Sequence, residues 1–136
     1  MSKLPSRKRC IIAAALGLAS GVLCAWLASQ KDPAIFDLKS FTFWSIVWNR
    51  YLIGLTIALA GAYRFHPLFG FRIVPALRGA ILGAIVSLAL AFGALITPAE
   101  NAAQIFWLTV GVGALYGLTI DLIATKIGGE GKGLLK

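Results

Sequence analysis

The sequence predicts an all-α fold: an integral membrane four-helix bundle built from two tandem parallel-repeat helical hairpins. The chain is 59% hydrophobic and only 13% charged, about half the charged fraction of a typical soluble domain. Its apolar residues form four runs of about 20 residues, each long enough to cross a hydrocarbon core of ~30 Å. The sequence also repeats itself, which is the signature of a duplicated unit.

The repeat is clearest between the second and fourth apolar runs, at an offset of 63 residues. Phe43-Trp44 recurs as Phe106-Trp107, and Gly-Leu-Thr-Ile occupies both 54–57 and 117–120. The first and third runs match less closely, at an offset of 66. Since a hairpin copied in tandem keeps its orientation, we expect two hairpins related by an axis along the membrane normal. The predicted hairpins are 10–64 and 76–127.

The apolar runs and their breaks define four predicted helices. The first follows a basic tail of residues 1–9 and is too long for a signal-peptide core. The second ends before Pro67, because the residue before a proline is pushed out of helical geometry. The third follows Pro75, and a turn at 97–101 leads to the fourth, after which a glycine-rich tail at 128–133 is expected to be flexible. The predicted helices are 10–29, 43–65, 76–96 and 103–126.

Basic residues gather on one side of the predicted membrane and account for the formal net charge of +8. They precede the first helix, flank the connection between the second and third, and follow the fourth. The positive-inside rule therefore places both termini in the cytoplasm. The same rule explains the charge without a nucleic-acid partner, and the N-terminal cluster is expected to contact anionic lipids at the cytoplasmic face. This cluster consists of Lys3, Arg7, Lys8 and Arg9.

Small residues recur at four-residue spacing in each predicted helix. In lipid, helices gain packing energy when small residues let their backbones approach closely. We expect these residues to pack the helices of one bundle, with an interface between protomers as the alternative. The glycines concerned are Gly17, Gly21, Gly54, Gly79, Gly83, Gly113 and Gly117.

Two charges inside the predicted membrane form a candidate pair, Arg78 and Asp121. They lie about equally far from the turn between the third and fourth helices, so an antiparallel hairpin places them at the same depth. Either charge alone would be costly in lipid. The matching positions of the first hairpin, Ile12 and Ala58, are apolar, so the two charges were gained or lost together. We expect a packing pair, with proton or ion binding by Asp121 as the alternative.

Asn49 and Arg50 form a candidate polar site in the outer leaflet, about two turns from the outer end of the second helix. An arginine at that depth can extend its charge to the interface, where Glu100 or Asp37 would meet it. We expect this structural arrangement, with a site that attracts anions as the alternative.

The sequence offers no constellation for catalysis, cofactor binding or metal binding. It has one histidine and two cysteines, and both cysteines, Cys10 and Cys24, lie at or within the first helix. No nucleophile and base stand at a recognised spacing. We therefore expect neither an enzyme nor a bound cofactor.

Chain length and helix number resemble those of small multidrug transporters and fluoride channels. The first helix lacks the glutamate with which the transporters bind cation and proton, and the charge bias differs from the balanced charge of fluoride channels. The pattern of Asn49-Arg50, Arg78-Gly79 and Ile120-Asp121 is similar to that of small bacterial membrane proteins. This resemblance implies a bacterial cytoplasmic membrane and carries no activity.

From these features we expect a small structural or accessory membrane protein that acts through helix packing with itself or with a membrane-protein partner. The alternative is a minimal homo-oligomeric channel or transporter for a small solute. Few polar residues line any one helix, whereas a water path needs several, which favours the first function.

The charge distribution predicts which connections a reagent outside the cell can reach. A cysteine introduced at Asn101 should react with an impermeant thiol reagent in intact cells, and one at Ser2 only after lysis. Labelling of both variants before and after lysis measures this. The reverse pattern would contradict the assignment of the termini to the cytoplasm.

Overall fold

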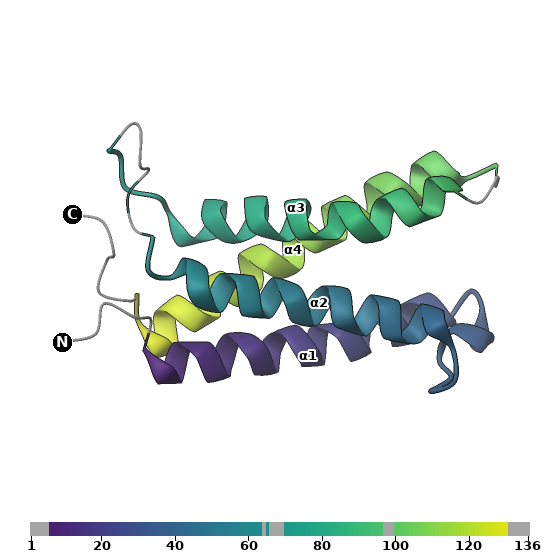
Figure 1. Cartoon of the computed structure of the whole chain (residues 1–136), viewed down its shortest axis with the longest axis horizontal. Helices are drawn as coiled ribbons and strands as arrows, with labels where there is room; N and C mark the ends of the chain where they lie inside the picture. The colour runs from purple at the N-terminus through teal and green to yellow at the C-terminus, as the bar shows by residue number, and fades with distance from the viewer. Residues whose placement is uncertain (1–5, 64, 66–69, 97–99, 131–136) are drawn as a thin grey trace.

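The computed structural model describes residues 6–63, 65, 70–96 and 100–130 (Figure 1). This part of the chain is helical and contains no β-strand. Each of its four α-helices is long and apolar enough to cross a membrane, so the prediction of an all-α chain with four such helices is confirmed. The helices are α1 (Arg7–Ser29), α2 (Phe41–Ala60), α3 (Pro75–Ile96) and α4 (Ala102–Gly128), with a short 3-10 helix η1 (Pro33–Ile35) between α1 and α2.

Six of the eight helix ends differ from the predicted bounds by one to five residues, and the following three bear on the fold. α1 begins earlier, at Arg7, because the Ser6 hydroxyl caps it by accepting a hydrogen bond from a backbone N–H in the first turn. α2 ends earlier, at Ala60, and side chains of other helices bind carbonyl groups at its end. α4 continues to Gly128, so the beginning of the predicted flexible tail is ordered helix, while 131–133 lies outside the described residues.

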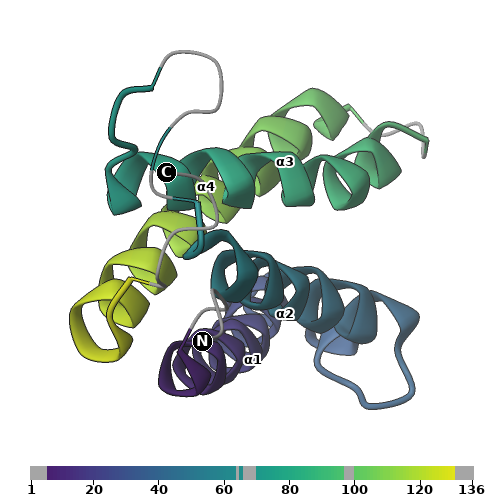
Figure 2. The same ribbon diagram turned by 60° about the vertical axis from the view of Figure 1, so that its left-hand side comes forward.

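The four helices alternate in direction (Figures 1 and 2). The beginnings of α1 and α3 and the ends of α2 and α4 lie together at one end of the molecule, which we call the terminal end. The opposite end, the distal end, holds η1 and the beginnings of α2 and α4. Consecutive helices therefore form two hairpins, α1–α2 and α3–α4.

α4 joins the two hairpins at the terminal end. It is tilted, so that its last turns lie away from α3 and against the beginning of α1 (Figure 2). There the Ser6 hydroxyl donates to the Gly128 carbonyl oxygen at 2.6 Å. Gly128 permits this approach, because a Cβ at its position would lie 2.6 Å from the Cα of Arg9.

Glycines bring the two helices of each hairpin into close contact. A Cβ added at Gly17 of α1 would lie 2.9 Å from the Cα of Gly54 in α2, and one added at Gly83 of α3 would lie 3.0 Å from the Cα of Gly117 in α4. Real Cβ atoms essentially never come closer than 3.0 Å to other heavy atoms, and the Cβ at Gly83 would also collide with the Gly113 carbonyl group, so both contacts require glycine. The missing side chains let the backbones touch, which is the main source of packing energy between helices in an apolar solvent.

The buried apolar core is small and the large apolar side chains lie mostly outside. One core cluster lies where the hairpins meet and contains Ala13, Ile53, Ile57, Ala58, Ile120 and Ala124. A second lies between α1 and the beginning of α2 and contains Ala25, Phe43 and Val47. Outside, the side chain of Trp107 is 70% exposed and many leucines and isoleucines are more than 40% exposed.

The glycine contacts predict a sharp difference between two substitutions on α3. Gly83→Ala should lower the free energy of unfolding by about 1–3 kcal/mol, because the added Cβ would collide with the backbone of Gly113. Gly93→Ala has open space around its position and should be neutral or stabilise by up to ~1 kcal/mol. Thermal unfolding of both variants in one detergent measures the difference. Equal melting temperatures would contradict the close α3–α4 contact.

Candidate functional site

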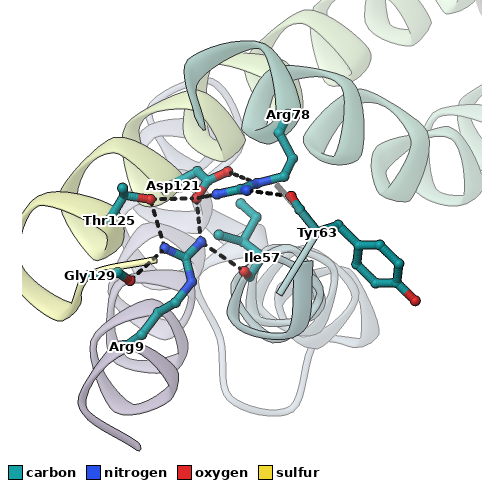
Figure 3. A network of polar contacts seen from close by, with 7 residues as sticks. All are labelled: Arg9, Ile57, Tyr63, Arg78, Asp121, Thr125 and Gly129. Carbon is teal, nitrogen blue, oxygen red and sulfur yellow. Dashed lines mark hydrogen bonds and ion pairs between the residues drawn. The ribbon is translucent and has the colours of Figure 1, made fainter. Parts of the chain in front are cut away.

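The interior holds two groups of buried polar side chains, and the first surrounds Asp121. The Asp121 carboxylate on α4 is 0% exposed, and so is the side chain of Arg9 from the first turn of α1. Arg78 from the first turn of α3 is almost as deeply buried. We call these three residues, together with Thr125, the Asp121 cluster (Figure 3).

Both oxygens of the Asp121 carboxylate are occupied by donors. Arg78 binds it with two nitrogens, Nε to Oδ2 at 2.8 Å and Nη2 to Oδ1 at 2.9 Å, the fork geometry that suits a guanidinium and a carboxylate. Arg9 donates to Oδ1 through Nη2. The Thr125 hydroxyl donates to Oδ1 at 3.2 Å and accepts from Arg9 Nη1 at 2.7 Å. Three donors reach Oδ1 and one reaches Oδ2, so the orientation of the carboxylate is held by groups from α1, α3 and α4.

Helix ends supply the remaining acceptors of the Asp121 cluster. In the last turn of α2 the Ile57 carbonyl accepts from Arg9 at 3.1 Å, and three residues beyond that helix the Tyr63 carbonyl accepts from Arg78 at 2.9 Å. At the end of α4, the Gly129 carbonyl accepts from Arg9 at 3.4 Å. The last carbonyls of a helix lack partners within the helix and carry about half a negative charge. Two helix ends therefore offset the charge that one carboxylate leaves on two guanidinium groups.

The structure brings the predicted residues Arg78 and Asp121 together, but it adds a third charge that the sequence interpretation placed elsewhere. Arg9 was expected to contact lipid headgroups with the rest of the basic tail, and this was wrong. Because α1 already begins at Arg7, residue 9 lies on the buried face, four residues before Ala13 and eight before Gly17. That four-residue spacing was the signal in the sequence that could have identified Arg9.

The second group of buried polar side chains surrounds Arg50, halfway along α2. Its side chain is 2% exposed and donates through Nη1 to Asn49 Oδ1 at 3.0 Å and to the Ser87 hydroxyl on α3 at 2.7 Å. Asn49 in turn donates to the Val86 carbonyl at 3.0 Å. The Arg50 Cζ lies 5.5 Å from the centroid of the Tyr116 ring on α4. We call Asn49, Arg50, Ser87 and Tyr116 the Arg50 cluster.

The expectation that Arg50 extends toward Glu100 or Asp37 was wrong. Arg50 lies on the face of α2 that includes Val47 and Gly54, both buried, so its side chain enters the space between the hairpins. The Ser87 hydroxyl and the Asn49 amide provide acceptors there. Ser87 escaped the sequence interpretation because it continues the four-residue spacing of Gly79 and Gly83 and looks like one more small packing residue.

The glycines singled out in the sequence are all buried and lie at helix contacts. Besides the contacts between Gly17 and Gly54 and between Gly83 and Gly117, a Cβ at Gly21 would lie 2.9 Å from the Cα of Val47. The seven glycines are Gly17, Gly21, Gly54, Gly79, Gly83, Gly113 and Gly117.

The described residues contain no group of three or more histidine, cysteine or acidic side chains that could hold a metal ion. Cys10 and Cys24 are free and half-buried. An open pocket of about 580 Å³ adjoins the Asp121 cluster at Thr125 and is also lined by Arg72 and Glu130. These two residues form an ion pair at 3.4 Å.

Comparisons of the chain with protein-family models, with curated proteins and with solved structures gave no match. The function of the chain must therefore be inferred from the geometry of the two clusters.

The presence of Arg9 predicts how the Asp121 cluster responds to substitution. Asp121→Ala should lower the free energy of unfolding by about 3–5 kcal/mol, because it leaves two guanidinium groups buried without a carboxylate. Arg78→Ile combined with Asp121→Ala should restore only part of this loss, since Arg9 stays charged. Adding Arg9→Met removes the last charge and should restore most of the stability.

Thermal unfolding of the single, double and triple variants in the same detergent measures this order. Full recovery already in the double variant would show that Arg9 contributes nothing to the cluster. Losses that simply add from variant to variant would contradict a shared ion-pair network.

Proposed function

We propose that this chain is a small integral membrane protein with a structural or accessory function, which acts through helix packing with itself or with a membrane-protein partner. The observation that supports this most directly is the Asp121 cluster. Its members come from α1, α3 and α4, and Arg9 also binds the Ile57 carbonyl in the last turn of α2, so the main polar network of the described interior joins all four helices. Both oxygens of the Asp121 carboxylate accept from arginine donors, which supports a structural function for this group.

The distribution of side chains supports insertion in a membrane. The helices are long and apolar enough to cross one, and large apolar side chains cover their outer faces, as Leu115 and Trp107 illustrate. A soluble protein rarely exposes so much contiguous apolar surface. The terminal end holds most of the basic residues that the structure describes. It is then the cytoplasmic end, and we propose a bacterial cytoplasmic membrane.

The glycine contacts support an origin by tandem duplication. At an offset of 66 residues Gly17 corresponds to Gly83, and at an offset of 63 Gly54 corresponds to Gly117. Gly17 contacts Gly54 through the backbone in the first hairpin, and Gly83 contacts Gly117 in the same way in the second. At the offset of 63 residues Arg50 corresponds to Gly113. A Cβ at Gly17 would lie 3.0 Å from the Arg50 carbonyl oxygen, and one at Gly83 would collide with the Gly113 carbonyl oxygen. The repeated letters of the sequence thus coincide with repeated contacts.

A second function, a minimal homo-oligomeric channel or transporter for a small solute, is favoured by one observation. Arg50 carries a positive charge into the middle of the fold without an acidic side chain beside it. Buried charges of this kind often mark solute pathways in membrane proteins.

Gentle purification of the tagged chain from membranes distinguishes the two functions. We expect a membrane protein to co-purify with it, together with anionic lipids, and not with an unrelated four-helix membrane protein carrying the same tag. Mass spectrometry of the eluates identifies the partner. Recovery of a lone homo-oligomer that passes a small solute across liposomes, with the flux lost in Arg50→Met, would overturn the accessory function.

A further inference from the structure

The positive charge of Arg50 has no negative counterpart among the side chains of the protein. The sequence has five acidic residues, all in the described part of the chain, and Arg50 takes part in none of the ion pairs found there. The acidic groups lie elsewhere. Asp121 binds Arg9 and Arg78, and Glu130 pairs with Arg72. Asp32 and Asp37 accept from backbone N–H groups between α1 and α2, and Glu100 lies just before α4.

Helix ends cannot offset this charge either. Arg50 lies nine residues after the first residue of α2 and ten before the last, which places it roughly 14 Å from both ends at ~1.5 Å per residue. The partial charges of a helix act mainly within its first and last turns. Arg9 and Arg78, by contrast, lie against two helix ends and a carboxylate. Each cluster contains a buried guanidinium Nε without a partner among the described residues, that of Arg9 and that of Arg50, but Arg50 has neither a carboxylate nor a helix end beside it.

The hydrogen bonds of Arg50 are incomplete as well. Both of its bonds to side chains use a single nitrogen, Nη1, and Nε is buried without a partner among the described residues. A guanidinium stays protonated under all ordinary conditions. It therefore cannot escape the cost of burial by losing its proton, and a buried donor without an acceptor adds to that cost.

We propose that Arg50 binds a small monovalent anion, of the halide or nitrate class, on the Nε side of its guanidinium. One negative charge is what the cluster lacks, so a monovalent anion matches it, and an anion that holds its water weakly loses least on entering a buried site. The site lies at the crossing of α2, α3 and α4, so its occupation stabilises the contact between the hairpins.

The anion site does not depend on the accessory function. An anion can bind at Arg50 whether the chain acts through a partner or conducts a solute. Failure to find a partner protein would therefore not contradict the anion site. Absence of anion binding would not contradict the proposed accessory function.

Anion-dependent thermal unfolding of the purified full chain tests the site. At constant ionic strength, replacing gluconate by chloride should raise the melting temperature of the protein by a few degrees, with saturation. The shift should vanish in Arg50→Met and persist in Arg7→Met, which removes an exposed arginine of the same helix bundle. No chloride-dependent shift in the wild-type protein, or an equal shift in Arg50→Met, would overturn the proposal.

Crystals soaked in bromide locate the anion without any substitution and decide the matter if Arg50→Met fails to fold. The anomalous signal should show a bromide within hydrogen-bond distance of Arg50 Nε. Bromide found only beside exposed cations would overturn the site, whatever the unfolding measurements show.

Discussion

The Asp121 carboxylate determines how the two hairpins are held together. It is the one acidic side chain in the interior of the described chain, and it binds an arginine from the first turn of α1 and another from the first turn of α3. Arg9 also binds the Ile57 carbonyl in the last turn of α2, and Arg78 binds the Tyr63 carbonyl just beyond that helix. Without Asp121, two cations would face each other in a buried site, so the arrangement of all four helices at the terminal end depends on this single group.

Glycine packing and the buried charges act at different levels of the fold. Each contact between glycine backbones contributes only ~0.1–0.2 kcal/mol per atom pair, but the contacts continue along each hairpin and set the separation of its helices. The interface between the two hairpins is less extensive than the interface within each hairpin. Van der Waals contacts there are therefore too few to fix how one hairpin is aligned against the other. There a single buried charge left unpaired costs several kcal/mol, which is enough to exclude alternative alignments of the hairpins.

The sequence predicted the helices because each is a long apolar run. It predicted one ion pair because two charges lie equally far from a turn. Arg78 and Asp121 are equally far from a turn, and that places them together in any antiparallel hairpin. Arg9 and Arg50 required knowledge of which face of a helix is buried and what lies opposite. For Arg9, the positive-inside rule already explained the charge, so its four-residue spacing to Ala13 carried no weight. For Arg50, an acceptor on another helix, Ser87, decides between an inward and an outward side chain.

Under the proposed duplication, the buried charges occupy positions whose counterparts in the other hairpin are uncharged. The position that corresponds to Asp121 in the first hairpin is Ala58, and the position that corresponds to Arg50 in the second is Gly113. Where the second hairpin has glycine, a Cβ would collide with the Ser87 hydroxyl, the same group that binds Arg50. A glycine in one copy thus leaves room for the polar contact of the other. The glycine of one copy and the polar side chain of the other therefore fit together. The buried polar clusters of the protein lie at positions where the two copies differ, and the positions that they share serve helix packing.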